Sequence, residues 1–343
     1  MTCPGKLLVT ANGCPENRLD AARVLASLVS DGWVPTDDCR QADLVVLSMC
    51  GLTGEEEARS RFFLDHLDSN RKPGARVVAC GCLAASCQFR DGQTGRDSLF
   101  GADQVGDLLS ALRPDGSSAV RPAHQLAPVL RLPQSARWNI PRPKNRERRQ
   151  YAIESLLRYY RDCFDRRTAP LGRRTFCLEI ATGCLGNCSY CSTRQARGVL
   201  RSKPVAEVLG ELEGGLERGH QDIALLGTEV GCYGHDHGAD LCVLLAEILA
   251  RCGDWRLRLR NVHPLHLARL LPGLLPFLRA GKVSVISTAL QSGSDRVLEA
   301  MRRGYNAASF VRSVRAIKRE APEVRIRTPV MVGFPTETEA EFA

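Results

Sequence analysis

The chain has 343 residues, of which 44% are apolar and 25% charged, a composition typical of a globular protein with room for two domains or more. No stretch approaches the ~18 uncharged apolar residues of a membrane span, and residues 1–14 lack the basic region and long apolar run of a secretory signal. We therefore expect a cytoplasmic protein without membrane attachment. The 15 cysteines are an odd number, which disfavours a disulfide framework and favours metal ligands or reactive thiols.

Short apolar runs alternate with amphipathic stretches over residues 1–112, which we assign to a first domain. The predicted strands of this domain are Leu7–Thr10, Leu44–Ser48 and Arg76–Cys80. The predicted helices are Arg18–Val29, Glu55–Leu67 and Val105–Leu112. Because the strands are apolar throughout and alternate with helices, we predict a parallel sheet covered by helices on both faces.

The periodic pattern is lost from Arg113 to about Gln150, as in an exposed linker, and a short helix is predicted at Tyr151–Cys163. We assign residues 113–165 to this linker and helix. Residues 137–174 hold twelve Lys and Arg against four acidic residues, which is +8 of the formal net charge of +9. This basic band suggests a polyanion such as RNA, although a solvated linker could have the same composition. The candidate RNA contacts are Arg142, Lys144, Arg146, Arg148 and Arg149.

A second alternation of strands and helices fills residues 166–343, which we assign to a second domain. Its predicted strands are Phe176–Ile180, Asp222–Leu226, Trp255–Leu259, Val283–Ser287 and Val324–Val332. The predicted helices between them are Val205–Glu217, Asp240–Cys252, Leu265–Leu278, Asp295–Met301 and Ala307–Arg319. Repeated βα units with right-handed crossovers form a barrel or a doubly wound sheet. The series stops where another helix should start, so we expect a unit truncated at its C-terminal end.

The sharpest motif is GCLGNCSYC, which places Cys184, Cys188 and Cys191 directly after the first strand of the second domain. Three thiolates at this spacing can bind one face of a cubic iron–sulfur cluster and leave one iron free for a small molecule. The alternative is a structural zinc site, which would want a fourth ligand, and the next Cys or His is Cys232 or His235. The pair His235 and His237 has no third ligand, so we interpret both as loop residues.

Three more cysteines, Cys14, Cys50 and Cys82, each follow a predicted strand of the first domain. Loops after parallel strands lie at one edge of the sheet, so these thiols can converge on one site. They could equally be buried small apolar residues, as free cysteines often are. Cys80 and Cys87 lie close enough to Cys82 to leave the third position open, although a Gly-Cys pair at a strand end favours Cys82. The cysteines in strands and helices, Cys80, Cys177, Cys242 and Cys252, are expected in the core.

The two cysteine sets together resemble the methylthiotransferases of the radical S-adenosylmethionine superfamily, and the resemblance covers nearly the whole chain. Three further segments carry it: GTEVGCYG (Gly227–Gly234), LQSGSDRVLEAMRRGY (Leu290–Tyr305) and VMVGFPTETEAEF (Val330–Phe342). The resemblance implies an N-terminal α/β domain followed by a partial (β/α)6 radical SAM barrel. It also implies two [4Fe-4S] clusters, S-adenosylmethionine and an external electron donor.

By the same resemblance, Cys184, Cys188 and Cys191 are catalytic and hold the cluster that binds S-adenosylmethionine. Cleavage of this cofactor yields a radical that removes hydrogen from a substrate C–H bond. Cys14, Cys50 and Cys82 hold the second cluster, which supplies the methylthio group. The cofactor is expected to contact Tyr190, Gly227, Thr228, Glu229, Ser292, Gly333, Phe334 and Pro335, although each of these could instead be a turn residue at a strand end.

The sequence divides over the substrate. The segment GCLGNCSYCSTRQARGVLRSKP resembles the subgroup that modifies threonylcarbamoyladenosine in tRNA, and the basic band suits tRNA phosphates. The N-terminal segments GCPENRLDAARVL and SMCGLT resemble the subgroup that acts on an aspartate of a small-subunit ribosomal protein. A tRNA substrate is therefore favoured, and a ribosomal protein or peptide is the alternative.

Overall fold

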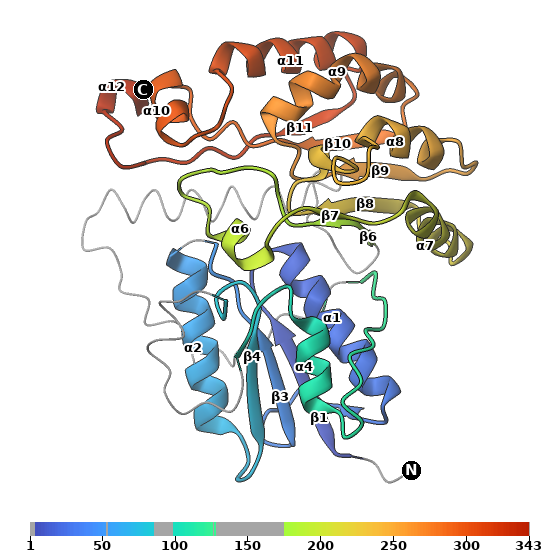
Figure 1. Cartoon of the computed structure of the whole chain (residues 1–343), viewed down its shortest axis with the longest axis vertical. Helices are drawn as coiled ribbons and strands as arrows, with labels where there is room; N and C mark the ends of the chain where they lie inside the picture. The colour runs from blue at the N-terminus through green and yellow to red at the C-terminus, as the bar shows by residue number, and fades with distance from the viewer. Residues whose placement is uncertain (1–3, 53, 86–98, 126, 128–174, 343) are drawn as a thin grey trace.

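The computed structural model describes residues 4–52, 54–85, 99–125, 127 and 175–342. Two α/β units are stacked along the long axis, with the N-terminal unit in the lower half of Figure 1 and the C-terminal unit in the upper half. The predicted helix at 151–163 and the five candidate RNA contacts lie outside the described residues. Within the described part, every helix is too short or too polar to cross a membrane.

The N-terminal unit is a five-stranded parallel sheet in the order β2-β1-β3-β4-β5. The strands are β1 (Lys6–Ala11), β2 (Val34–Pro35), β3 (Leu44–Ser48), β4 (Arg76–Cys80) and β5 (Leu99–Phe100). The three predicted strands and the parallel sheet are confirmed. The sequence gives no sign of β2 and β5, because two residues are too few to show a periodic pattern.

Helices cover both faces of this sheet (Figure 1). They are α1 (Pro15–Ser30), α2 (Gly54–Asn70) and α4 (Val105–Leu112). Alternate strand residues point to opposite faces, so Leu7 and Val9 pack with α1 and α4 in one core, and Leu8 and Val45 pack with α2 in another. Two cores on one sheet explain why the central strands are apolar at every position.

The segment after α4 is only partly the exposed linker that we expect. Residues 114–122 are mostly exposed, but the next few residues pack between the two units. The amide of Ala127 donates to the carbonyl of Arg18 over 3.1 Å, and the carbonyl of His124 accepts from the amide of Cys177 over 2.8 Å. The His124 ring also stacks on Phe176 at 4.4 Å between centroids. This segment therefore ties α1 to the second sheet.

The second sheet has the order β11-β10-β9-β8-β6-β7, and all its strands are parallel except β7. The strands are β6 (Thr175–Thr182), β7 (Arg201–Ser202), β8 (Asp222–Gly227), β9 (Arg256–Leu259), β10 (Val283–Ser287) and β11 (Arg325–Arg327). Each crossover reaches the next strand in the same direction, as in a barrel, but the described strands form an open sheet rather than a closed one. The strand β11 is shorter than predicted, because Pro329 lacks the amide that a strand needs.

The helices of this unit are α6 (Ser192–Arg197), α7 (Val205–Glu217), α8 (Leu241–Leu249), α9 (Pro264–Arg279), α10 (Asp295–Ala300), α11 (Ala307–Glu320) and α12 (Glu339–Phe342). Four of them, α7, α8, α9 and α11, lie on one face of the sheet, whereas α6 lies at the junction with the first unit (Figure 1). Side chains of α7, α8, α9 and α11 form one core with the sheet. The opposite face contacts the first unit, where Leu19 of α1 packs against Cys177, Ala224 and Leu226. The first unit therefore covers the inner face of the open half-barrel.

The cysteines expected in the core divide into two groups. Cys80 and Cys177 are buried in strands, as expected. Cys242 is only half-buried, and Cys252 is exposed. The expectation for Cys252 is wrong because α8 ends at Leu249, before its apolar face can cover that position.

Candidate active site

The three dispersed cysteines of the first unit meet at the carboxyl edge of its sheet. Cys14, Cys50 and Cys82 follow the adjacent strands β1, β3 and β4. The Cys14 thiol donates a hydrogen bond to Cys50, and Cys82 lies close enough to interact with both. From β1 the chain continues to β2 on one side, and from β3 it continues to β4 on the other side. The strand order therefore reverses between β1 and β3, beside the cysteine group. This reversal is the usual binding position in open α/β sheets.

The environment of these thiols differs from one to the next. The hydrogen bond from Cys14 lowers the pKa of Cys50 to about 7, whereas that bond and burial raise the pKa of Cys14. Burial raises the pKa of Cys82 to about 11, although the Arg197 side chain, which donates to Cys82, acts against this rise. Cys80 faces the core, where burial raises its pKa to about 12, and Cys87 lies outside the described residues. Among the described cysteines, Cys82 is therefore the third member of this group.

A glycine permits the close approach of two of these cysteines. Gly13 has a φ of +82°, and a Cβ atom at this position would lie 2.3 Å from the Cβ and 2.4 Å from the Sγ of Cys50. Only glycine tolerates both the left-handed backbone and this contact. The hollow that holds the Cys50 thiol against Cys14 therefore depends on the missing side chain of Gly13.

The second cysteine group lies on one loop after β6. A Cβ atom on Gly186 would lie 3.3 Å from the Sγ of Cys184 and 3.9 Å from the Sγ of Cys188, so both sulfurs line one hollow. The Gly186 amide donates to Cys184 over 3.1 Å. Burial raises the pKa of Cys184 to about 11, and the charges of Glu229, Cys188 and Cys191 add to this rise.

Three anchors hold this loop. Gly183 has a φ of +72°, and a Cβ there would lie 1.9 Å from the carbonyl oxygen of Val199. Ser189 donates through its amide to Met301 and through its hydroxyl to Ala300, at the end of α10. Arg303 is buried and donates to the Sγ of Cys188 over 3.3 Å. The sequence motif thus supplies the sulfurs, and a distant segment fixes their position.

The two cysteine groups adjoin across the junction of the units. The hydroxyl of Ser192, the residue after Cys191, donates to the carbonyl of Gly51, the residue after Cys50, over 3.2 Å. The helix α6 runs from this point along the junction, as Figure 1 shows. Its last residue, Arg197, pairs with Asp20 of α1 at 2.8 Å. One short helix therefore connects the immediate surroundings of both groups.

A further contact joins the two carboxyl edges. Asn261, two residues after β9, donates to both the Glu16 carboxylate and the Gly227 carbonyl, each over 3.0 Å. Glu16 lies in the first turn of α1, two residues after Cys14. The carboxyl ends of both sheets therefore face the same space between the units.

Among the residues expected at the cofactor, Glu229 is the most constrained. One carboxylate oxygen accepts from the amides of Gly231 (2.7 Å) and His263 (2.9 Å), and the other contacts Nδ1 of His266 at 2.5 Å. Burial opposes the ionised form of Glu229, but these hydrogen bonds outweigh it and lower the pKa of the carboxyl group. The bond to His266 contributes most to this lowering. Its carboxylate is thus held mainly by the protein itself, through partners other than arginine.

Cys232 lies beside Glu229, and together with His266 these residues bring three potential metal-ligand atoms within 4.8 Å. Each group is already engaged, because the Cys232 thiol donates to the Glu229 carbonyl and accepts from the Leu185 amide of the cysteine loop. We therefore interpret this cluster as a support for the loop. His237 contacts the ring of Tyr233 edge-on, as expected for a loop residue.

The remaining expected cofactor residues lie along the same edge. Tyr190 is half-buried beside Arg303 and Tyr305, and burial raises its pKa. The Ser292 hydroxyl accepts from the Ser294 amide, so it also serves the turn before α10. Gly227 ends β8 and Thr228 follows it, and the last three residues of this set follow β11: Gly333, Phe334 and Pro335.

Arg260 and Thr288 are functional candidates that the sequence does not reveal, and they share a feature with the expected residue Thr228. Thr228, Arg260 and Thr288 directly follow β8, β9 and β10, and each has a buried polar atom without a hydrogen-bond partner among the described residues. Such buried atoms normally find a partner, so a polar ligand at this edge would satisfy them. The signal available in the sequence is position: each is the first residue after a strand of the second sheet.

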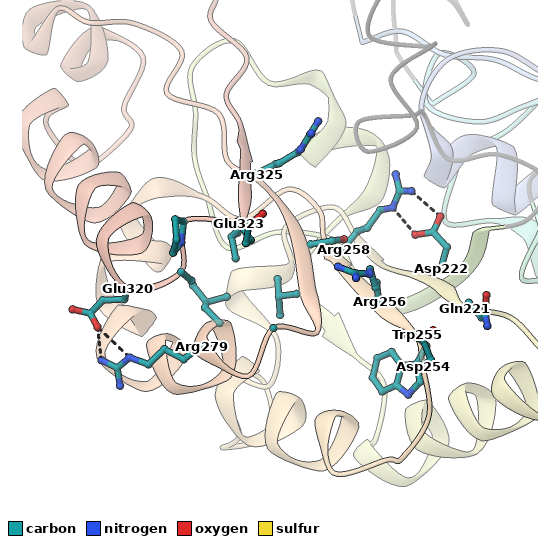
Figure 2. Close-up of a pocket in the computed structure, with 17 residues that line it drawn as sticks. Gln221, Asp222, Asp254, Trp255, Arg256, Arg258, Arg279, Glu320, Glu323 and Arg325 are labelled. Atoms are coloured by element: carbon teal, nitrogen blue, oxygen red, sulfur yellow. Dashed lines mark hydrogen bonds and ion pairs between the residues drawn. The ribbon is translucent and has the colours of Figure 1, made fainter.

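The opposite edge of this sheet carries a different kind of hollow. A cavity of about 860 Å³ lies among the amino ends of β8 to β11. Figure 2 shows two ion pairs in its lining: Arg258 pairs with Asp222 at 2.6 Å, and Arg279 pairs with Glu320 at 2.8 Å. The cavity lies at the far end of the strands of this sheet from the cysteine groups.

Comparison with known proteins identifies the class. Residues 178–343 match the radical SAM superfamily, and residues 6–99 match a family described as uncharacterized protein family UPF0004. The chain belongs to the radical S-adenosylmethionine methylthiotransferase family and is a transferase.

Three relatives illustrate the range of this family. The tRNA-2-methylthio-N(6)-dimethylallyladenosine synthase of Syntrophobacter fumaroxidans is 30% identical, and the match covers 99% of this chain and 69% of the relative. A probable threonylcarbamoyladenosine tRNA methylthiotransferase of Pyrococcus horikoshii is 28% identical, with coverages of 98% and 72%. The ribosomal protein uS12 methylthiotransferase RimO of Chlamydia pneumoniae is 26% identical, with coverages of 96% and 64%. The relatives thus span three substrates.

Solved structures share the fold. The radical S-adenosylmethionine methyltransferase TsrM of Kitasatospora setae superposes with a TM-score of 0.57 at 17% identity, covering 98% of this chain and 69% of that one. The cobalamin-dependent enzyme OxsB superposes with a TM-score of 0.54 at 12% identity, covering 95% and 49%. These likenesses show that the two-unit arrangement is an established fold.

The family uses S-adenosylmethionine and two [4Fe-4S] clusters, and the donor sets of this chain fit that chemistry. Each unit offers three thiols grouped at a carboxyl edge, the number that leaves one iron of a cubic cluster open. The unsatisfied atoms of Thr228, Arg260 and Thr288 fit a polar cofactor beside the second group.

Proposed function

We propose that the protein transfers a methylthio group to an unactivated C–H bond of threonylcarbamoyladenosine in tRNA. The observation that supports this proposal above all is the juxtaposition of the two cysteine groups, joined by the hydrogen bond from Ser192 to Gly51. A reaction that generates a radical at one centre and quenches it with sulfur from another needs the two centres to share one space.

In this proposal, Cys184, Cys188 and Cys191 hold the cluster that binds S-adenosylmethionine, and Cys14, Cys50 and Cys82 hold the second cluster. When bound, these groups supply a carbon radical and the sulfur. The protein's part is to orient the reacting groups and exclude water. Thr228 and Ser292 bind polar atoms of the cofactor, Tyr190 packs on its adenine, and Gly333, Phe334 and Pro335 wall the adenine pocket.

The role of Glu229 in the proposal is narrower than the sequence suggests. Its carboxylate already accepts from two amides and contacts His266. A carboxylate has about four acceptor positions, so room remains for one bond to the cofactor ammonium, next to Gly227. We assign Glu229 both tasks, with the structural one primary.

Two observations favour tRNA as the substrate. The segment from Thr193 to Pro204 resembles the threonylcarbamoyladenosine subgroup, and a relative with that name aligns over 98% of this chain. The basic band suits tRNA phosphates through Arg142, Lys144, Arg146, Arg148 and Arg149. The proposed domains are residues 1–112, 113–165 and 166–343, and the proposed setting is the cytoplasm, with an external electron donor.

A ribosomal protein is the second candidate substrate, because the segments around Cys14 and Cys50 resemble the subgroup that modifies one. A relative named for uS12 also aligns over 96% of this chain. Both candidates share the C–H chemistry and the two cysteine groups. They differ in the charge and shape of the molecule that must reach the junction.

The test begins with anaerobic reconstitution, which should give about eight irons per chain for two clusters and about four for one. The reconstituted protein is then offered tRNA containing threonylcarbamoyladenosine, or a peptide of the ribosomal protein, with S-adenosylmethionine and reductant. Thiomethylated tRNA supports the proposal, whereas modified peptide alone supports the second candidate. Neutralising the five basic residues should weaken tRNA binding and reduce its salt dependence by up to about five counterions. An unchanged salt dependence would exclude them as phosphate contacts.

A further inference from the structure

Arg197 is a buried cation placed between the two cysteine groups. It is the last residue of α6, a helix whose N-cap is Cys191. Only 5% of Arg197 is exposed. A guanidinium stays charged even when buried, so this position requires partners for a full positive charge and for its N–H groups.

The partners come from the first unit. One terminal nitrogen of Arg197 pairs with Asp20 at 2.8 Å, and its side chain donates a hydrogen bond to the Cys82 thiol. Cys14 and Glu16 also lie within its electrostatic reach. The guanidinium therefore contacts the Cys14, Cys50 and Cys82 group directly.

An ion pair that only joins the two units would explain part of this arrangement. Asp20 also binds Arg23 at 3.2 Å, and Arg23 binds Glu179 of β6 at 2.6 Å, so a second pair already connects α1 to the second sheet. The bond from Arg197 to Cys82 also crosses the junction, but it ends on a thiol of the Cys14, Cys50 and Cys82 group. Arg197 thus contacts this group in addition to joining the units.

The Nε–H of Arg197 provides an independent observation. This buried atom has no hydrogen-bond partner among the described residues. A buried donor without an acceptor costs about 1–3 kcal/mol, so native structures rarely keep one. An acceptor at the sulfur group beside Cys82 would satisfy this donor. The polarisable sulfur of a bound cluster is such an acceptor.

We propose that Arg197 is a positioning residue for the iron–sulfur group held by Cys14, Cys50 and Cys82, to whose sulfur it donates an N–H while it supplies a compensating positive charge. This inference rests on the proposed function, because it requires a cluster at these cysteines. Since Cys191 is the N-cap of α6 and Arg197 is its last residue, Arg197 also fixes the offset between the two clusters.

The proposal has a measurable electrostatic consequence. N–H donors to cluster sulfurs and nearby positive charge stabilise the reduced form, which carries one more negative charge, and raise the reduction potential. Removing Arg197 should lower the potential of this cluster. Removing the negative charge of Asp20, while Arg197 stays, should raise it. A residue that merely joined the two units would give no such opposite signs.

The experiment isolates this cluster in full-length protein carrying Cys184→Ala, Cys188→Ala and Cys191→Ala. Its iron content should be about four per chain, and its midpoint potential is followed by electron paramagnetic resonance. We expect Arg197→Gln to shift the potential downward and alter the spectrum, Arg197→Lys to shift it less, and Asp20→Asn to shift it upward. Arg194→Gln on the same helix is the matched control and should match the parent.

The outcomes separate the two proposals. If the parent with three alanines binds no iron, the second cluster of the proposed function is absent, and this inference falls with it. If the parent binds iron but Arg197→Gln and Arg197→Lys leave its potential and spectrum unchanged, the positioning role of Arg197 is refuted and the proposed function is not. If Arg197→Gln does not fold, Arg197→Lys and Asp20→Asn decide: opposite shifts support the proposal, and equal potentials refute it.

Discussion

The two cysteine groups reach similar arrangements by different routes. Cys184, Cys188 and Cys191 lie on one loop, so their grouping is local and follows from spacing. Cys14, Cys50 and Cys82 follow three strands and come together only when the sheet forms. The first group can therefore be recognised in any chain that contains it, whereas the second exists only as a property of the fold.

The groups also differ in what supports them. The loop group depends on contacts from distant segments, such as Arg303 and Ser189, which hold its sulfurs and its backbone. The sheet group depends on the close contact of Gly13 with Cys50 and on Arg197 from the other unit. Each group is thus completed by residues that its own motif does not contain.

The largest expected effect follows the loss of a sulfur from the loop group. Cys188→Ala should abolish the formation of both 5′-deoxyadenosine and the thiomethylated product. The reason is that two cysteines do not hold a cluster that can bind and cleave S-adenosylmethionine. Chromatography of the reaction after anaerobic reconstitution measures both compounds. Formation of 5′-deoxyadenosine at the unmodified rate would remove Cys188 from the catalytic centre.

The sheet group should behave differently. Cys50→Ala should stop methylthio transfer and leave 5′-deoxyadenosine formation largely intact, since the loop group keeps its three thiols. Iron content should fall from about eight to about four per chain. Normal thiomethylated product from this variant would show that the sheet group does not take part in sulfur transfer.

A glycine pair tests whether the sheet group depends on close contact. Gly13→Ala places a Cβ 2.3 Å from that of Cys50 at a φ of +82°, so we expect loss of about four irons per chain. Gly74→Ala is the control, because Gly74 has a φ of +80° and nothing within 4 Å of the added atom. It should cost only about 1–2 kcal/mol of backbone strain and keep its iron. Equal iron in both variants would disprove the contact argument.

The sequence predicts the elements that show a hydrophobic periodicity and the residues whose place at a strand end fixes their position. Helix α7 at Val205–Glu217 and strands β3 and β4 match their predicted limits. The helix has a clear helical periodicity of apolar residues, and the strands are continuous apolar runs. Placement after parallel strands also predicts that Cys14, Cys50 and Cys82 meet. The sequence gives no sign of the helix α6, since Ala196 is the one apolar residue among its six and no apolar period can be seen.

The contacts that complete the site follow from no local rule. Arg197 and Arg303 look like ordinary basic residues in the sequence, yet both are buried and donate to cysteine sulfur. Glu229 was expected to face the cofactor, but its partners are two amides and His266, which depend on the position of α9. Tertiary packing decides such roles, and one chain without its fold does not reveal them.

The smallest expected effect concerns the junction on which both groups depend. Glu179→Gln removes the charge of the buried partner of Arg23, which keeps its pair with Asp20. Breaking a buried ion pair typically lowers the free energy of unfolding by about 3–5 kcal/mol. Because Arg23 keeps its contact with Asp20, we expect a loss of about 3 kcal/mol. Chemical denaturation should show a lower midpoint and a separation into two transitions, because this pair joins the two units.

The matched control for this variant is Glu247→Gln in the same unit. Glu247 pairs with Arg251 on the surface of α8 at 3.4 Å, and Arg251 also binds Glu213. Exposed helix pairs contribute about 0.3–0.5 kcal/mol, so the midpoint should barely move. Equal midpoints for the two variants would mean that the buried pair at the junction is no stronger than a surface one. The alignment of the two cysteine groups would then rest on the other contacts between the units, such as those of α6 and the bond from Asn261 to Glu16.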